Sequence, residues 1–112
     1  MMDAFDMSEI EEGHRKNGEL YHEFFKAERR SIGLYACEAG ATDPQVPHTE
    51  DEIYYIVSGT GMIEVAGEHR PVSAGSVIYV GVNVDHRFHS ITEDLSVIVV
   101  FAPPRRSLAV QS

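Results

Sequence analysis

The sequence is short of basic residues, cysteine and long apolar runs, and each shortage excludes a class of protein. Nine Lys and Arg stand against 18 Asp and Glu, which gives a net charge of −9. Nucleic acid and anionic membranes repel such a chain, so neither is expected as a partner. The one cysteine, Cys37, excludes an internal disulfide. No apolar stretch approaches the roughly 20 residues of a membrane-spanning helix.

The first residues also lack a targeting signal. Met1–Asp6 is acidic and has neither the basic nor the apolar part of a secretion signal, so we expect a cytoplasmic protein. A length of 112 residues with 43% hydrophobic content fits one globular domain. We expect a head over residues 1–19, the folded domain over residues 20–104 and a tail over residues 105–112.

Short segments rich in β-branched and aromatic residues follow one another with glycines between them, which predicts an all-β sandwich or barrel. The expected strands are Leu20–Lys26, Ile32–Cys37, Ile53–Val57, Met62–Val65, His69–Val72, Ser76–Val80, His86–His89 and Leu95–Phe101. A turn is predicted over residues 58–61. Ser8 and Glu11 form the pattern of a capping box, which predicts a brief helix through Glu12 that Gly13 or Gly18 ends.

Alternation along the strand at residues 52–57 predicts which side chains share a face. Glu52, Tyr54 and Ile56 lie on one side, and Ile53, Tyr55 and Val57 lie on the other. Both sides are largely apolar, so both should be covered. One side would line the interior, whereas the other would meet a second sheet, the N-terminal segment or a partner subunit. Since exposed apolar patches usually mark contacts, we expect a homodimer.

Two segments carry residues of the kind that bind metal ions. The first has Gly40, five residues, Val46-Pro-His48, three residues, Glu52, six residues and Gly59. This spacing resembles the first motif of the cupin superfamily, which has a histidine where Val46 stands. The second segment keeps the glycine and the histidine of the second cupin motif at Gly75 and His86. It departs from that motif at the positions of Gly81, Asn83 and Ser90.

The resemblance covers roughly residues 30–102 and implies a double-stranded β-helix, the jelly-roll barrel of RmlC-like cupins. It implies one divalent ion (Fe, Mn, Ni, Cu or Zn) bound by His48, Glu52 and His86. It also supports a dimer, because many cupins pair through their outer faces. Residues four apart on a straight strand lie about 13 Å from each other, so the chain must bend near residues 49–51. Glu50 is a rival ligand, although only Glu52 keeps the spacing to Gly59.

Simpler interpretations of these three residues remain open. His48 fits a surface histidine paired with Glu50 or Asp51, Glu52 fits a solvated strand end, and His86 fits an exposed residue. The joint spacing of both motifs favours ligation. The side chains expected around a bound substrate are Val46, Glu50, Tyr54, Tyr35 and Phe88.

The missing first histidine has two consequences. A valine at position 46 removes one ligand and leaves a coordination position for water, dioxygen or substrate. Two histidines and a carboxylate form the ligand set of many non-haem iron oxygenases. The sequence therefore favours a metal-dependent, dioxygenase-like enzyme, with isomerase or lyase as variants, that acts on a small polar organic molecule; no catalytic residue is assigned. The alternative is a non-enzymatic small-molecule-binding module with a weak or vestigial metal site.

Overall fold

The computed structural model describes residues 2–45 and 47–106 and shows one helix followed by six strands in this part of the chain. The elements are α1 (Met7–Asn17), β1 (Tyr21–Lys26), β2 (Ser31–Cys37), β3 (Asp51–Val65), β4 (Glu68–Val72), β5 (Val77–Val80) and β6 (His86–Ala102). The protein is therefore mainly β, with an antiparallel jelly-roll barrel after an N-terminal helix, as the sequence predicted.

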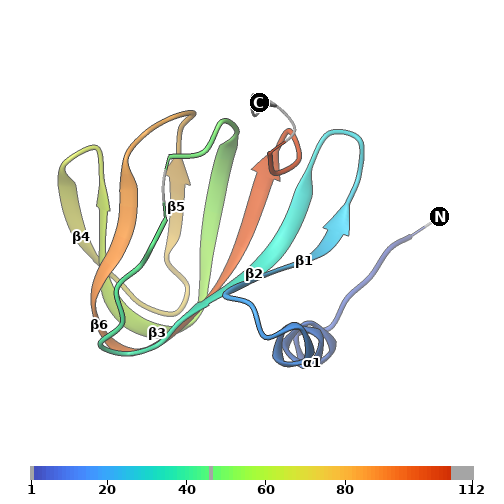
Figure 1. Cartoon of the computed structure of the whole chain (residues 1–112), viewed down its shortest axis with the longest axis horizontal. Helices are drawn as coiled ribbons and strands as arrows, with labels where there is room; N and C mark the ends of the chain where they lie inside the picture. Colours follow the sequence, from blue (N-terminus) through green and yellow to red (C-terminus); the bar gives the residue numbers. More distant parts are fainter. Residues whose placement is uncertain (1, 46, 107–112) are drawn as a thin grey trace.

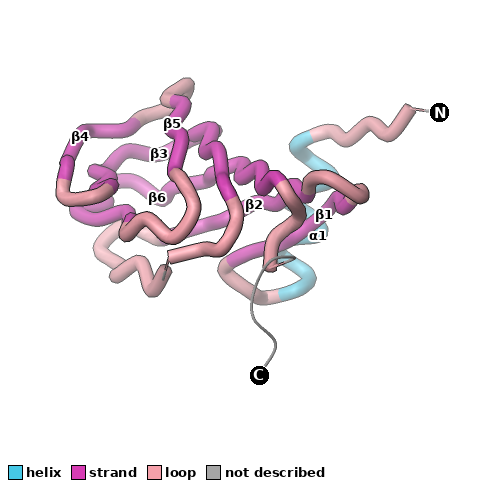
Figure 2. The backbone as a smooth tube through the Cα atoms, turned by 90° about the horizontal axis from the view of Figure 1, so that it is seen from above, coloured by secondary structure: helices cyan, strands magenta, loops and turns pink. Residues whose placement is uncertain are grey.

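Two long strands, β3 and β6, connect the two halves of the barrel. They pair antiparallel from Asp51↔Ala102 to Val65↔His86. The first half of β3 also pairs with β5, its second half pairs with β4, and the far half of β6 pairs with β2. Figure 1 shows these strands side by side, and Figure 2 shows from above that they wrap round rather than lying in one plane. One rolled sheet therefore encloses a single interior.

The predicted turn over residues 58–61 is wrong, because β3 runs through it. Register shifts between Ile56 and Met62 bend the strand there without ending it. Gly59 makes this bend with a φ of 98°, and a Cβ at this position would lie 2.2 Å from the carbonyl oxygen of Asp94. The expected separate strands at 86–89 and 95–101 are likewise parts of the continuous β6. Bulges look like turns in a sequence because both use glycine.

The alternation predicted for β3 is confirmed. Tyr54 and Ile56 are buried in the main core, together with Val97, Val99 and Phe101 of β6. Ile53 and Tyr55 are 44% and 47% exposed on the outer face. They lie beside Tyr79 and Val77 of β5, which are also exposed. The outer face of β3 and β5 is therefore apolar, and the described residues of the single chain leave it exposed.

The N-terminal helix is longer than the sequence predicted. Asp6 precedes α1 without a side-chain cap, so the predicted capping box of Ser8 and Glu11 does not begin it. The helix runs through Gly13 and ends at Gly18, which takes the left-handed conformation. It packs on β1 and β2 (Figure 1) and does not cover the apolar patch on β3 and β5. No helix in the described ranges is long and apolar enough to cross a membrane.

Candidate metal centre

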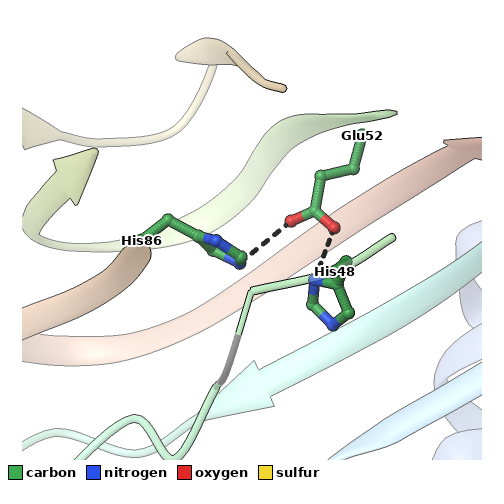
Figure 3. A group of neighbouring side chains, drawn as sticks. All are labelled: His48, Glu52 and His86. Carbon is green, nitrogen blue, oxygen red and sulfur yellow. Dashed lines mark ion pairs between the residues drawn. The ribbon is translucent and has the colours of Figure 1, made fainter. Parts of the chain in front are cut away.

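The structure brings the three predicted ligands together at one end of the barrel. Glu52 lies near the start of β3, His86 is the first residue of β6, and His48 lies in the loop that precedes β3. Figure 3 shows the three side chains pointing toward one another. One donor atom from each lies within 4.8 Å of the other two. Among the described residues this is the one group of at least three such side chains that meets this distance.

The bend that the chemistry requires lies directly before β3. Thr49 and Glu50 form a bend, and the strand begins only at Asp51. The backbone N–H of Asn83 donates a hydrogen bond of 2.7 Å to the carbonyl of His48. Asn83 stands where the second cupin motif has glycine, and it adopts a left-handed φ of 56°, which asparagine tolerates. This contact ties the loop that carries His48 to the loop that leads into His86.

The distances within the group are those of ligands that share an ion. Nδ1 of His48 lies 2.8 Å from one oxygen of Glu52, and Nε2 of His86 lies 3.2 Å from the other. None of these four buried atoms has a hydrogen-bond partner of acceptable geometry in the described chain. Two ligands about 2.1 Å from one ion and at right angles to each other lie about 3 Å apart. Unpartnered lone pairs at this separation fit a divalent cation.

The backbone orients the imidazole of His86. Its Nδ1–H donates to the carbonyl of Val84 at 2.9 Å, which leaves Nε2 facing Glu52. Such a bond to the second ring nitrogen is the usual support of a metal-binding histidine. Burial alone would lower the pKa of His86, but the Glu52 carboxylate and the Val84 carbonyl raise it above the ordinary value. In the metal-free protein, a proton on Nε2 can therefore compensate the charge of Glu52 at pH values below this raised pKa.

Glu52 supplies the negative charge of the site. Its side chain is 1% exposed. Burial raises its pKa, but the nearby His48, His86 and Tyr54 outweigh burial and lower the pKa to about 2. Glu52 is therefore ionised at neutral pH. A buried carboxylate needs a compensating cation, and the arrangement offers two: a proton on the imidazole or a metal ion.

The other residues expected around a substrate occupy different places. Tyr35 lines a cavity beside His48. Tyr54 and Phe88 are buried in the core, where their rings pack on each other at 5.2 Å and Tyr54 lies 6.0 Å from His86. The Glu50 carboxylate accepts hydrogen bonds from the Thr49 hydroxyl and the Arg106 backbone, and Glu50 is not part of the convergent group. Val46 lies outside the described residues.

Two residues near the site, Asp43 and Gln45, were missed in the sequence. Asp43 is buried and accepts hydrogen bonds from the Tyr35 hydroxyl, the Gln45 amide and the backbone of Phe88. Gln45 in turn accepts from the Tyr54 hydroxyl at 3.0 Å. These bonds hold residues 43–45 against the barrel. The Asp-Pro-Gln sequence resembles an ordinary polar loop, and no sequence signal distinguishes it from one.

The cavity beside His48 has a volume of about 410 Å³. Its walls come from the segment around β1, from β2, from the loop before β3 and from the end of β6. The lining residues are Glu19, Leu20, Tyr21, Tyr35, Pro44, Gln45, His48, Val99, Phe101, Arg105 and Arg106. The two arginines follow the last strand, in the segment expected to form a tail. A pair of basic residues in an acidic chain was the available signal for them.

A second cluster of two histidines and a glutamate lies outside the barrel. Nδ1 of His69 lies 3.0 Å from Nε2 of His89, and His69 lies 3.8 Å from Glu64. Arg87 donates to the same glutamate at 3.1 Å. These groups therefore partner one another.

Comparison with known proteins shows the family. Residues 33–101, more than half of the chain, match the family described as cupin domain. The chain is also 48% identical over 103 residues to the uncharacterised protein SCO3923 of Streptomyces coelicolor, covering 92% of this chain and 98% of that one. This protein belongs to the cupin family.

Solved structures show the same fold. TT1209 from Thermus thermophilus matches with a TM-score of 0.74 and 21% identity, over 92% of this chain and 99% of that chain. An RmlC-like cupin with a double-stranded β-helix from Methanocaldococcus jannaschii matches with a TM-score of 0.66 and 20% identity, over 74% and 78%. Such distant likeness establishes the barrel and leaves the reaction open, since one fold supports many activities.

Proposed function

We propose that this cupin is a metal-dependent enzyme that acts on a small polar organic molecule held in the cavity beside His48. The observation that supports it best is the buried convergence of His48, Glu52 and His86, whose facing atoms have no hydrogen-bond partner among the described residues. The bound ion would be Fe, Mn, Ni, Cu or Zn, and it would polarise a substrate oxygen or support oxygen chemistry. We favour an oxygenase, because two histidines and one carboxylate suit non-haem iron, with isomerase and lyase as variants.

The protein's own groups would hold and orient the reactants. Glu52 stays ionised, and the Val84 carbonyl keeps Nδ1 of His86 protonated, so that Nε2 faces the centre. Burial raises the pKa of Tyr54 well above its ordinary value, and its hydroxyl donates to Gln45. Tyr54 is therefore a fixed hydrogen-bond donor rather than a base. The apolar walls at Val99 and Phe101 limit the water around a bound molecule.

Metal analysis followed by activity screening tests the proposal. Purified protein is stripped of metal, offered each of the five ions at pH 7.5 and measured by elemental analysis. We expect one ion per chain. The loaded protein is then tested for oxygen uptake with small diols and keto acids, and for isomerisation or elimination of the same compounds. Failure to bind any ion in stoichiometric amount would contradict the proposal.

The alternative is a binding module without catalysis. It is supported by the absence of an evident general base near His86 among the described residues, since Tyr54 stays neutral and Glu50 is engaged by Thr49 and Arg106. A metal-loaded protein that binds small molecules and turns none over would favour this function. The two possibilities therefore differ in turnover rather than in ligand binding.

We also propose a homodimer formed through the outer face of β3 and β5. Ile53, Tyr55, Val77 and Tyr79 lie adjacent there, and each is 44% to 63% exposed. Burying such a patch against a second copy would remove apolar area from water. Light scattering should give twice the 12.5 kDa chain mass. Tyr55→Glu should shift the mass to that of a monomer, whereas wild-type protein that is already monomeric would rule out the dimer.

A further inference from the structure

Arg105 is held at the cavity by contacts of the backbone around it. Its N–H donates at 2.9 Å to the hydroxyl of Ser31, a fully buried residue at the start of β2. The next N–H, of Arg106, donates to the buried carboxylate of Glu50. These two bonds fix the segment after β6 against the barrel, and both arginines line the cavity. A positively charged side chain is thus placed at the cavity that His48 also lines.

The guanidinium of Arg105 has an aromatic neighbour and no carboxylate partner in the described chain. Its Cζ lies 4.6 Å from the centre of the Tyr21 ring. No ion pair joins it to an acidic residue within residues 2–45 and 47–106; this includes Glu19, which also lines the cavity. Its five N–H donors are fixed in a planar fork that matches a carboxylate.

Tyr21 also lines the cavity, with its hydroxyl turned against Gly33 of β2. This hydroxyl is buried and has no hydrogen-bond partner among the described residues. Burial raises the pKa of Tyr21 far above its ordinary value, so the group stays protonated and can donate. The ring fits there because position 33 is glycine, where a Cβ would lie 2.2 Å from this hydroxyl. Glycine at position 33 thus makes room for the phenol ring, whose oxygen has no partner in the described part of the chain.

Aromatic contacts link Tyr21 to His48, the one candidate ligand that lines the cavity. The Tyr21 ring lies 6.0 Å from that of Phe101, and Phe101 lies 5.2 Å from His48. All of these residues line the same cavity of about 410 Å³. This volume is at the small end of ligand pockets. A molecule of a few carbon atoms could therefore contact both ends.

We propose that the ligand of this site is a small organic acid, whose carboxylate is bound by Arg105 while an oxygen at its other end faces the candidate metal centre at His48. Only the contact between the other oxygen and the candidate metal centre rests on the proposed function. The carboxylate contact follows from the guanidinium at the cavity, which has no carboxylate partner among the described residues, and it does not require a metal.

The test compares acids with their amides, which have nearly the same shape and no charge. A panel of C2–C5 hydroxy and oxo acids, from glycolate and pyruvate to 2-oxoglutarate, is titrated by calorimetry at pH 7.5 into metal-free and Zn²⁺-loaded protein. We expect at least one acid to bind about tenfold or more tightly than its amide. Arg105→Gln should remove that preference. Tyr21→Phe keeps the ring beside the guanidinium and removes only a buried hydroxyl, so it should leave that preference in place.

Matched variants separate ligand binding from folding. Arg70→Gln removes an exposed arginine on β4, outside the cavity, and should leave every affinity unchanged. Arg105→Lys should keep part of the preference for acids. The proposal is overturned if no acid binds more tightly than its amide, or if Arg105→Gln weakens acids and amides equally. Zn²⁺ uptake is measured separately, so that failure to bind metal contradicts the proposed function and leaves the acid preference measurable in metal-free protein.

Discussion

Two clusters in this barrel contain the same residue types, two histidines and one glutamate, and both involve β3 and β6. The inner cluster consists of His48, Glu52 and His86, and the outer cluster consists of His69, Glu64 and His89. In the inner cluster the Glu52 side chain is 1% exposed, whereas Glu64 in the outer cluster is 27% exposed. In the inner cluster the donor atoms face one another without hydrogen bonds; in the outer cluster Arg87 and the paired histidines partner the polar atoms.

The difference shows that residue types alone do not make a metal site. Water and Arg87 already stabilise the charge of Glu64, so a metal ion would have to displace both. Glu52 has no water-facing surface and no arginine, so a proton or a metal ion must balance its charge. Strand parity decides which histidine belongs to which cluster, because His86 and His89 are three residues apart and therefore point to opposite faces of β6.

The glutamates give the largest expected contrast. Glu52→Gln removes the one anionic ligand of the inner cluster and should weaken divalent-ion binding at least about 100-fold. Glu64→Gln makes the same change in the outer cluster and should leave binding within about twofold. Metal affinity would be measured by competition with a coloured chelator at pH 7.5, with circular dichroism to confirm that both variants are folded. Equal losses for the two variants would show that the outer cluster contributes to binding.

The histidines give a second contrast on a single strand. His86→Ala removes one ligand and should weaken metal binding about tenfold or more. His89→Ala, three residues along β6, should change the affinity little because its partners are His69 and Ser90. The same chelator competition measures both. A metal affinity that depended on His89 and not on His86 would reverse the assignment of the two clusters.

Acidity should act on the inner cluster in opposite directions with and without metal. The pKa of His86 is raised, so in metal-free protein its pairing with Glu52 is fully stabilising below pH about 6.5 and lost as pH rises through the raised value. The pKa of Glu52 is lowered to about 2, so its contribution is lost only as pH falls from about 4.5 toward that value. Metal binding requires the deprotonated imidazole and should weaken up to about tenfold per pH unit below the raised pKa.

Thermal unfolding of metal-free protein and chelator competition between pH 5.5 and 8.5 would measure the two trends. His86→Gln lacks the titrating group and should flatten both curves. The outer cluster serves as the reference, because Glu64 is partly exposed and its interactions are screened by salt. A metal affinity that did not change between pH 5.5 and 8.5 would contradict ligation by His86.

The smallest expected effect is a gain in metal affinity from a substitution at position 46. Val46→His restores the histidine of the first cupin motif and should tighten metal binding severalfold by adding a ligand. A histidine placed instead at Thr92, on the outer surface near Thr60, should have no effect. Tighter binding by the first variant alone would support an open coordination position in the inner cluster. No change would mean that position 46 does not reach the ion.

Much of the fold was predictable from local patterns. Alternation of apolar residues along β3 placed Tyr54 inside and Tyr55 outside, because successive side chains point to opposite faces of a strand. The spacing of glycines, histidines and glutamate in both motifs predicted the barrel and the three convergent side chains. The motif glycine Gly75 takes a φ of 93°, a conformation that other residues rarely adopt. A position that requires glycine is easy to recognise in a sequence, which is why the motif predicts the fold.

What the sequence determined by itself was therefore the alternation of faces, the excess of negative charge and the set of residues able to bind a metal. Tertiary structure decided which glutamate is buried away from water, because burial depends on strands far apart in the chain. It also decided that residues 58–61 form a bulged strand, since their partners lie in β6. It placed Arg105 beside Tyr21, two residues more than 80 positions apart, through hydrogen bonds to Ser31 and Glu50. Such contacts follow from the closure of the barrel, and no local pattern encodes them.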